Sequence, residues 1–224
     1  MSQPSLSLLL HLSDSLFPIG GYAHSDGLEA ATSSGEIAGP GDVRAWIATL
    51  LDETLARCDG PGVVLAWDAF SDGRWSALRA LDDELHALRP SSTLRQGSRS
   101  LGTRLLKTWQ RLHAHAGLET MLAGDAGWTH PVAFAAACAA IGADTRSAVE
   151  AFLYTRLAAA ASAAMRLMPL GQLEAHALVA EALDRVPRLC DALTRRRDLP
   201  SAFTPLADIA SMRQQYVTSR LFRS

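Results

Sequence analysis

Residues 145–167 read TRSAVEAFLYTRLAAAASAAMRL, with a run of small residues at Ala158–Ala161. Alanine and leucine have high helix propensity, and Asp144 just before the segment is a suitable N-cap. Pro169 follows, and proline lacks the amide hydrogen that a helix interior needs. The segment therefore predicts a helix over about 145–167, the longest of the chain, with a small-residue surface that another helix can approach closely.

The same pattern extends outward from this helix. Asp42 is an N-cap candidate before a stripe of apolar residues at helical spacing from Val43 to Leu55. Gly60-Pro61 is predicted to break the chain after this helix, and a polar, glycine-rich stretch over 117–129 is predicted to be a loop. Further helices are predicted over 63–70, 75–88, 94–112, 130–142 and 171–185, from Pro187 to the break at 198–200, and from Pro205 to about Tyr216.

Length and composition set the fold class. The chain has 224 residues, of which 48% are hydrophobic and 20% charged, enough for one substantial core. Its bias toward alanine and leucine favours helices over sheets. We therefore predict an all-α fold of about ten helices in a single domain, 1–224. The tail, 217–224, has little to bury and is expected to be loose when the protein is alone.

The net charge argues against some classes of binding partner, and the cysteine content indicates the cellular compartment. The formal net charge is −2, so no overall positive field draws the chain to nucleic acid or to an anionic membrane. Cys58, Cys138 and Cys190 are far apart and odd in number, which predicts buried free thiols in a reducing cytoplasm. No signal peptide or membrane span is expected, since the long apolar stretch near Leu157 is interrupted by Arg166.

No set of residues in the sequence predicts catalysis. His24, Asp26 and Glu29 lie close together, but a metal-binding helix normally carries two histidines one turn apart, so no metal site is predicted. Ser25 lies in His24-Ser25-Asp26-Gly27, outside the strand-to-helix elbow of serine hydrolases. No nucleotide-binding glycine loop is present either. The chain is expected to be non-enzymatic and to need no cofactor.

Two segments are instead typical of docking surfaces. Residues 17–22, Phe-Pro-Ile-Gly-Gly-Tyr, place aromatic residues at a turn beside a helix start, and Leu221-Phe222 add apolar bulk to a polar tail. Aromatic residues and arginine contribute most to protein interfaces. The alternative for the first segment is a turn whose Phe17 and Tyr22 pack into the core. For the tail it is permanent docking on the chain's own helices.

Several motifs, in order, resemble the UreF family of urease accessory proteins. The N-terminal stretch 16–29, LFPIGGYAHSDGLE, is similar to the family's signature. The middle motifs begin at Gly102, His130, Tyr154 and Met165, and the C-terminal ones cover 208–213 and 219–224. The resemblance runs from about residue 8 to the end of the chain. One departure is Gln214-Gln215, where members often carry His-Glu.

The resemblance implies an all-helical homodimer that bridges UreD, also called UreH, and the nickel-carrying GTPase UreG, and so engages apo-urease (UreABC) for nickel insertion. Tyr154 is expected near the two-fold contact, Pro18 and Tyr22 on a surface that faces UreG, with Gln172 a weaker candidate, and the tail on UreD. The expected partner-binding residues are Pro18, Gly20, Tyr22, His24, Ser25, Gly27, Glu29, Tyr154, Gln172, Arg220, Leu221 and Phe222.

Two other functions compete with the adaptor. The chain could activate the UreG GTPase with a cationic finger, but such an arginine should sit on an exposed, positioned loop, and the sequence shows no obvious one. It could also be a nickel-binding metallochaperone that uses His24 and neighbouring acids as ligands. Measuring nickel affinity distinguishes the two functions, because a metallochaperone binds nickel tightly and an adaptor need not.

Overall fold

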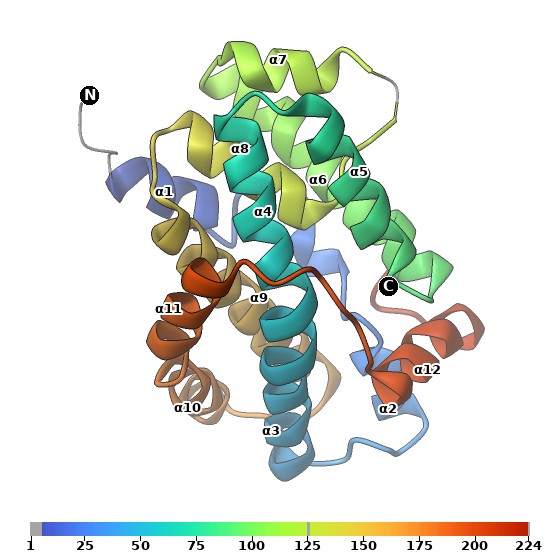
Figure 1. Ribbon diagram of the computed structural model, residues 1–224. Helices are drawn as coiled ribbons and strands as arrows, with labels where there is room; N and C mark the ends of the chain where they lie inside the picture. Colours follow the sequence, from blue (N-terminus) through green and yellow to red (C-terminus); the bar gives the residue numbers. More distant parts are fainter. Residues whose placement is uncertain (1–5, 125, 224) are drawn as a thin grey trace.

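The computed structural model describes residues 6–124 and 126–223, and within these ranges it contains helices and no strand (Figure 1). The α-helices are α1 (Leu6–Ser13), α2 (Leu28–Ser33), α3 (Pro40–Thr49), α4 (Gly60–Ser71), α5 (Trp75–Ala87), α6 (Ser92–Leu112), α7 (Ala116–Leu122), α8 (His130–Ala140), α9 (Thr145–Leu167), α10 (Gln172–Leu183), α11 (Val186–Arg196) and α12 (Pro205–Arg213). Two 3₁₀ turns, η1 (Gly21–Ala23) and η3 (Gln214–Tyr216), and a π-helix, η2 (Leu50–Asp59), complete the set. The predicted all-α fold is confirmed.

Helix α8 lies inside the fold, against α4, α6 and α9 (Figure 1). Every residue from Val132 to Cys138 is buried. A helix that is apolar all round can be stable only in such a position. The small side chains in this run allow the neighbouring helices to approach closely, and they place α8 within one continuous hydrophobic core.

The longest helix, α9, begins and ends where the sequence predicts. Ser147 N donates to Asp144 Oδ1 at 2.9 Å, which is the predicted N-cap. The helix ends at Leu167, shortly before Pro169. It packs against α2 and η1, which come from the N-terminal part of the chain, and against α10 and α11, which come from the C-terminal part. Side chains of α9 can therefore contact both ends of the chain.

The break predicted at Gly60-Pro61 is wrong. Helices α3, η2 and α4 follow one another without interruption, and the middle section is wound as a π-helix. Pro61 has no amide hydrogen, so the carbonyl of Arg57 lacks its usual donor in the next turn. Ser201 N, in the segment between α11 and α12, donates to Arg57 O at 2.8 Å. A distant segment thus satisfies the group that proline leaves free, which local sequence cannot reveal.

The loop predicted over 117–129 is also partly wrong, because α7 occupies its first half. His115 accepts from Gly117 N through Nδ1 at 3.1 Å and so caps the helix. Leu118 and Met121 are buried one turn apart. The stretch looks polar overall, but this apolar pair is enough to hold one short helix against the core.

Cys58, Cys138 and Cys190 are free and buried, as predicted. None of the described helices combines the length and the apolar composition that crossing a lipid bilayer requires. Residues 1–5 and Ser224, the ends of the predicted domain and tail, lie outside the described residues.

The close approach of α6 to the chain before α8 gives a stability prediction. A Cβ on Gly102 would lie 2.2 Å from Trp128 O and 2.6 Å from Thr129 O. Because backbone atoms cannot move aside cheaply, we expect Gly102→Ala to lower the free energy of unfolding by about 1–3 kcal/mol. Urea unfolding followed by far-UV circular dichroism measures this change.

The matched control is Gly41→Ala, in α3, where an added Cβ meets nothing within 4 Å. Alanine has the higher helix propensity, so this variant should be unchanged or more stable by about 0.5–1 kcal/mol. Equal stability of the Gly102→Ala protein and the wild type would contradict the close approach described above.

Candidate functional site

The signature segment folds into an irregular turn that leads into α2. Asp26 and Gly27 both have positive φ, 55° and 93°. A Cβ on Gly27 would lie 2.7 Å from Ser211 N, so only glycine allows α12 to approach the turn this closely. Asp26 is one of the few side-chain-bearing residue types that adopt this backbone region at moderate cost. The turn is therefore held by contacts outside itself.

Asp26 forms an ion pair with Arg156 of α9. The side chains of Asp26 and Arg156 are 33% and 15% exposed, so the pair is largely withdrawn from water. Burial alone would raise the pKa of Asp26, but the adjacent Arg156 guanidinium outweighs it and lowers the pKa. The carboxylate stays ionised and ties the signature turn to the longest helix.

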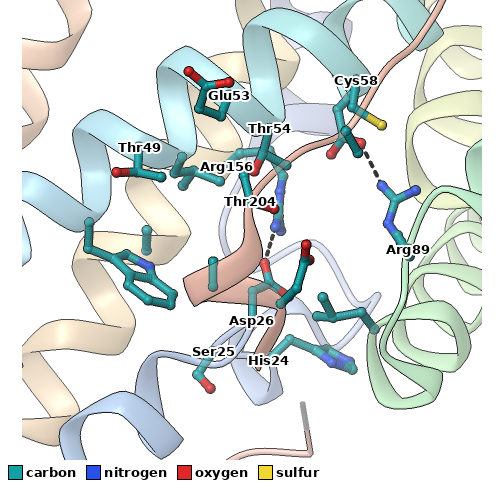
Figure 2. Close-up of a pocket in the computed structure, with 18 of the residues that line it drawn as sticks. His24, Ser25, Asp26, Thr49, Glu53, Thr54, Cys58, Arg89, Arg156 and Thr204 are labelled. Atoms are coloured by element: carbon teal, nitrogen blue, oxygen red, sulfur yellow. Dashed lines mark hydrogen bonds and ion pairs between the residues drawn. The ribbon is translucent and has the colours of Figure 1, made fainter. Parts of the chain in front are cut away.

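A second buried ion pair lies on another side of the same cavity. Arg89 Nη2 is 2.5 Å from Asp59 Oδ1, and Arg89 Nη1 donates to Leu85 O at 2.6 Å. Figure 2 shows Arg156 reaching Asp26, with Arg89 to one side of this pair, beneath Cys58. The cavity has a volume of about 360 Å³. Both of its arginines already have carboxylate partners.

Burial determines the protonation of two titratable side chains that line this cavity, Cys58 and His24. Burial raises the pKa of the Cys58 thiol to about 12, so this group stays protonated and unreactive. Burial is also the main reason that the pKa of His24 is lowered. Ser25 Oγ accepts from Glu29 N at 3.4 Å, as a helix-start residue does. No group of three or more metal-ligating side chains occurs within 6–124 and 126–223.

The C-terminal tail is fastened to α2 through one carboxylate. Glu29, which is 3% exposed, accepts from Leu221 N, from Phe222 N at 3.2 Å and from the Gln214 side-chain amide. The Phe222 ring is buried, with the Arg166 guanidinium 4.2 Å from its centre. The described part of the tail thus lies against the body, the arrangement that the sequence left as the alternative to a loose segment.

The tail also touches the signature segment directly. Arg223 N donates to Ala23 O at 2.7 Å, and Arg166 donates to Tyr22 O. The signature segment and the described part of the tail, 219–223, therefore lie next to each other. They come from opposite ends of the chain, and α9 supplies the arginines beneath them.

The expected partner-binding residues differ in how far they are exposed to solvent. The exposed residues are Pro18, Tyr22, Tyr154, Gln172, Arg220 and Leu221, the half-buried ones Gly20 and His24, and the buried ones Ser25, Gly27, Glu29 and Phe222. Of the two aromatic residues in the signature, Phe17 packs into the core and Tyr22 is 72% exposed. Tyr22 can therefore contact a partner, whereas Phe17 belongs to the core, as the alternative interpretation expected for both.

A second hollow is lined by both Tyr22 and Tyr154. It lies along α1 and α9, has a volume of about 960 Å³, and is lined mainly by apolar side chains. Leu6 and Leu10 of α1 are 68% and 63% exposed along it. Ala158 belongs to its wall, so the small-residue surface of α9 is partly open and not wholly covered by other helices.

Sequence reasoning missed the arginines of this region. Arg166 was noticed only as an interruption of an apolar run, yet both it and Arg156 of the same helix hold the N-terminal signature. A charged residue inside an apolar helix usually has a partner, and this was the available signal. The role of Glu29 had no local signal, because its donors are more than 180 residues away in the sequence.

Comparison with known proteins gives one consistent family. A family model described as UreF matches residues 37–183. The chain is 34% identical to the urease accessory protein UreF of Ralstonia pickettii, over 98% of this chain and 97% of that protein. It is 35% identical to the UreF of an Azoarcus species, over 96% and 94%. It is also 31% identical to a bifunctional UreEF of Bordetella bronchiseptica, of which it covers 52%.

The buried histidine His130 gives a pH prediction. Burial lowers its pKa from 6.5 to about 3, so the folded chain keeps it neutral while the unfolded chain protonates it below about pH 6.5. The unfolded state then binds more protons, and stability falls as the pH decreases from about 6.5 toward 3. Between about pH 7.5 and pH 5.5 this one group should remove about 1.4 kcal/mol.

Urea unfolding at the two pH values measures the effect. His130→Gln cannot titrate, so its loss of stability over this interval should be smaller than that of the wild type by about 1.4 kcal/mol. Comparing the two proteins cancels the other groups that titrate. An equal loss in both would show that His130 is not kept neutral by burial.

Proposed function

The chain belongs to the UreF family of urease accessory proteins, and we propose that it is a non-enzymatic adaptor that joins UreD (UreH) and the GTPase UreG to apo-urease in the cytoplasm during nickel insertion. The relatives carry the name of accessory proteins, which agrees with the expectation of a non-enzymatic chain. Nickel is the cargo of this process. The adaptor contributes binding energy, which selects among the states of its partners.

One observation supports this function most directly. The exposed Tyr22 and the exposed Leu221 belong to segments joined by the hydrogen bond from Arg223 N to Ala23 O. Beneath them, Asp26–Arg156 and Glu29 with its donors hold the backbone in one arrangement. A rigid base that presents an aromatic and an aliphatic side chain is typical of an interface anchor.

The proposed adaptor is a symmetric homodimer in which α9 contributes to the contact. The hollow along α1 and α9 supports this assignment, because Leu6, Leu10 and Tyr154 are exposed beside it. Apolar side chains that gather around an open hollow gain free energy when a second surface covers them. A copy of the same chain provides a matching apolar face under two-fold symmetry.

The surface around Pro18 and Tyr22 is proposed to face UreG, with Gln172 at the start of α10 as a weaker candidate. Tyr22→Ala should weaken UreG binding by about 2 kcal/mol or more if the tyrosine is a central contact. Because Tyr22 is 72% exposed, the same change should leave the melting temperature nearly unchanged. Isothermal titration calorimetry with UreG and differential scanning calorimetry measure the two quantities.

Tyr216→Ala is the matched control, since Tyr216 is 78% exposed in η3 and outside the signature segment. It should keep the wild-type affinity for UreG. Loss of thermal stability in the Tyr22→Ala protein, with UreG binding intact, would instead favour the core-packing role that the sequence left open.

The tail is proposed to bind UreD, with Leu221 in the contact and Arg220 hydrogen-bonding a carboxylate or carbonyls. Deletion of 219–224 should abolish UreD binding while the helical content survives. Leu221→Ala should weaken UreD binding by about 1–2 kcal/mol without changing the melting temperature, because the side chain is 54% exposed. Arg220→Lys should restore only part of the binding lost in Arg220→Ala, because lysine lacks the planar fork.

Leu112→Ala is the matched control, because Leu112 is also 54% exposed but lies at the end of α6. Surface plasmon resonance with immobilised UreD compares all five proteins. Full UreD affinity in the deletion variant would disprove the role of the tail. Phe222 is buried in this chain, so Phe222→Ala is expected to act through stability and is not a substitute test.

A further inference from the structure

Arginines without a carboxylate partner among the described residues occur in several places, and three of them lie at the signature segment. Ion pairs with Asp or Glu are formed by Arg44, Arg57, Arg74, Arg79, Arg89, Arg99, Arg146, Arg156, Arg185, Arg197 and Arg213. Arg104, Arg166 and Arg223 form none within the described residues, and all three are exposed. We call these three residues the arginine cluster.

Each member of the arginine cluster contacts or adjoins the segment 20–24. The Arg104 guanidinium lies 2.9 Å from the position that a Cβ on Gly20 would occupy, so the missing side chain makes room for it. Arg166 donates to Tyr22 O. The backbone of Arg223 is fixed by its hydrogen bond to Ala23 O. Three helices or segments far apart in sequence thus bring positive charge to one turn.

The two acids of the signature segment already have partners. Asp26 is ion-paired with Arg156, and Glu29 is buried and accepts backbone and amide hydrogens. His24 in the middle of the turn has a lowered pKa, chiefly through burial, and Arg104 and Arg223 are among the charges that add to this shift. The positive charge of the cluster is therefore not neutralised within the described residues, although the whole chain carries a net charge of −2.

Exposed apolar side chains lie in the same segments as these charges. Leu16 is 86% exposed, Tyr22 72% and Leu221 54%. A surface of unpaired arginines around exposed aromatic and aliphatic groups has the composition of an interface core with a charged rim. An oppositely charged partner would gain charge-assisted hydrogen bonds from the guanidinium groups and apolar contact from the side chains between them.

We propose that the arginine cluster is a docking surface for an acidic segment of a partner protein, in which Asp or Glu carboxylates alternate with apolar residues. The proposal deepens the assignment of Tyr22 to the UreG-facing surface and rests on that assignment for the identity of the partner. The acidic chemistry of the bound segment follows from the cluster alone.

A protein segment fits these observations better than nucleic acid or a lipid surface. Binding to a duplex draws its affinity mainly from many phosphate contacts, about 6–10 in a strongly salt-dependent complex, whereas the cluster offers three guanidinium groups around one turn. Anionic membranes attract polybasic segments of about 4–8 consecutive or closely spaced cations. The exposed Tyr22 and Leu221 of the same segments would be left without apolar partners on a phosphate backbone.

The test reverses charge at two members of the cluster in the full-length chain. The double variant Arg104→Glu/Arg223→Glu should bind UreG about tenfold or more weakly than wild type. The slope of log Kd against log salt concentration, measured between about 50 and 200 mM, should also decrease, because fewer charges meet in the complex. The double variant Arg104→Lys/Arg223→Lys keeps the charge and should lose about threefold or less.

Arg188→Glu is the matched control, since Arg188 is exposed on α11 and forms no ion pair in the described residues. It should change UreG affinity by about twofold or less. Circular dichroism and the melting temperature check that every variant is folded. Wild-type affinity and wild-type salt dependence in the charge-reversal protein would overturn the proposal.

A second arm separates this proposal from the assignment of UreG. A short fluorescent peptide of alternating glutamate and leucine is titrated with the chain, beside a lysine–leucine peptide, a DNA duplex and phosphatidylserine vesicles. Preferential binding of the acidic peptide that is lost in the Glu double variant supports the surface even if UreG itself does not bind. Tighter binding to the duplex or the vesicles, or no preference for the acidic peptide, overturns the protein-segment assignment.

Discussion

The pairing of Arg156 with Asp26 is the constraint on which the signature turn depends. A cation on an apolar helix cannot be left buried without an opposite charge, because desolvation costs several kcal/mol. Asp26 supplies that charge from a turn residue with φ of 55°, followed by Gly27 at 93°. The strained turn persists because α9 and α12 fix it from two sides. The long helix therefore determines where the N-terminal segment lies.

The charged residues inside this protein are paired, whereas those on the outer side of the signature turn are not. The two ion pairs that line the cavity are Asp26–Arg156 and Asp59–Arg89. Because each charge already has a partner, it is not free to bind a ligand or assist a reaction. Removing one partner of such a pair typically costs about 3–5 kcal/mol, so these residues serve the architecture first. The unpaired charges and the exposed aromatic side chain lie on the outside of the same turn. A rigid interior that supports a chemically active surface suits an adaptor.

The sequence predicted the features whose causes are local and missed those whose causes are distant. Asp144 marked the start of α9 because a cap bonds to residues three positions away. Gly60-Pro61 wrongly predicted a break, because the Arg57 carbonyl that proline leaves without a donor accepts a hydrogen bond from the distant Ser201 N. The docking turn was recognised as a segment, yet nothing local distinguishes the buried Phe17 from the exposed Tyr22. That choice depends on which face α9 and the tail cover.

Gln214 shows how one distant contact determines the chemistry of the tail. Gln214 is fully buried, and its amide donates to Glu29, which also holds Leu221 and Phe222. A histidine there, as family members often carry, could pair with Glu29 as a cation but would titrate between about pH 5 and 8. The amide cannot titrate, so its bond to Glu29 does not depend on protonation of this side chain. The exchange has a cost, because Gln214 Oε1 is buried and has no hydrogen-bond donor among the described residues. The chain thus holds its tail with a neutral donor at the expense of one unsatisfied acceptor.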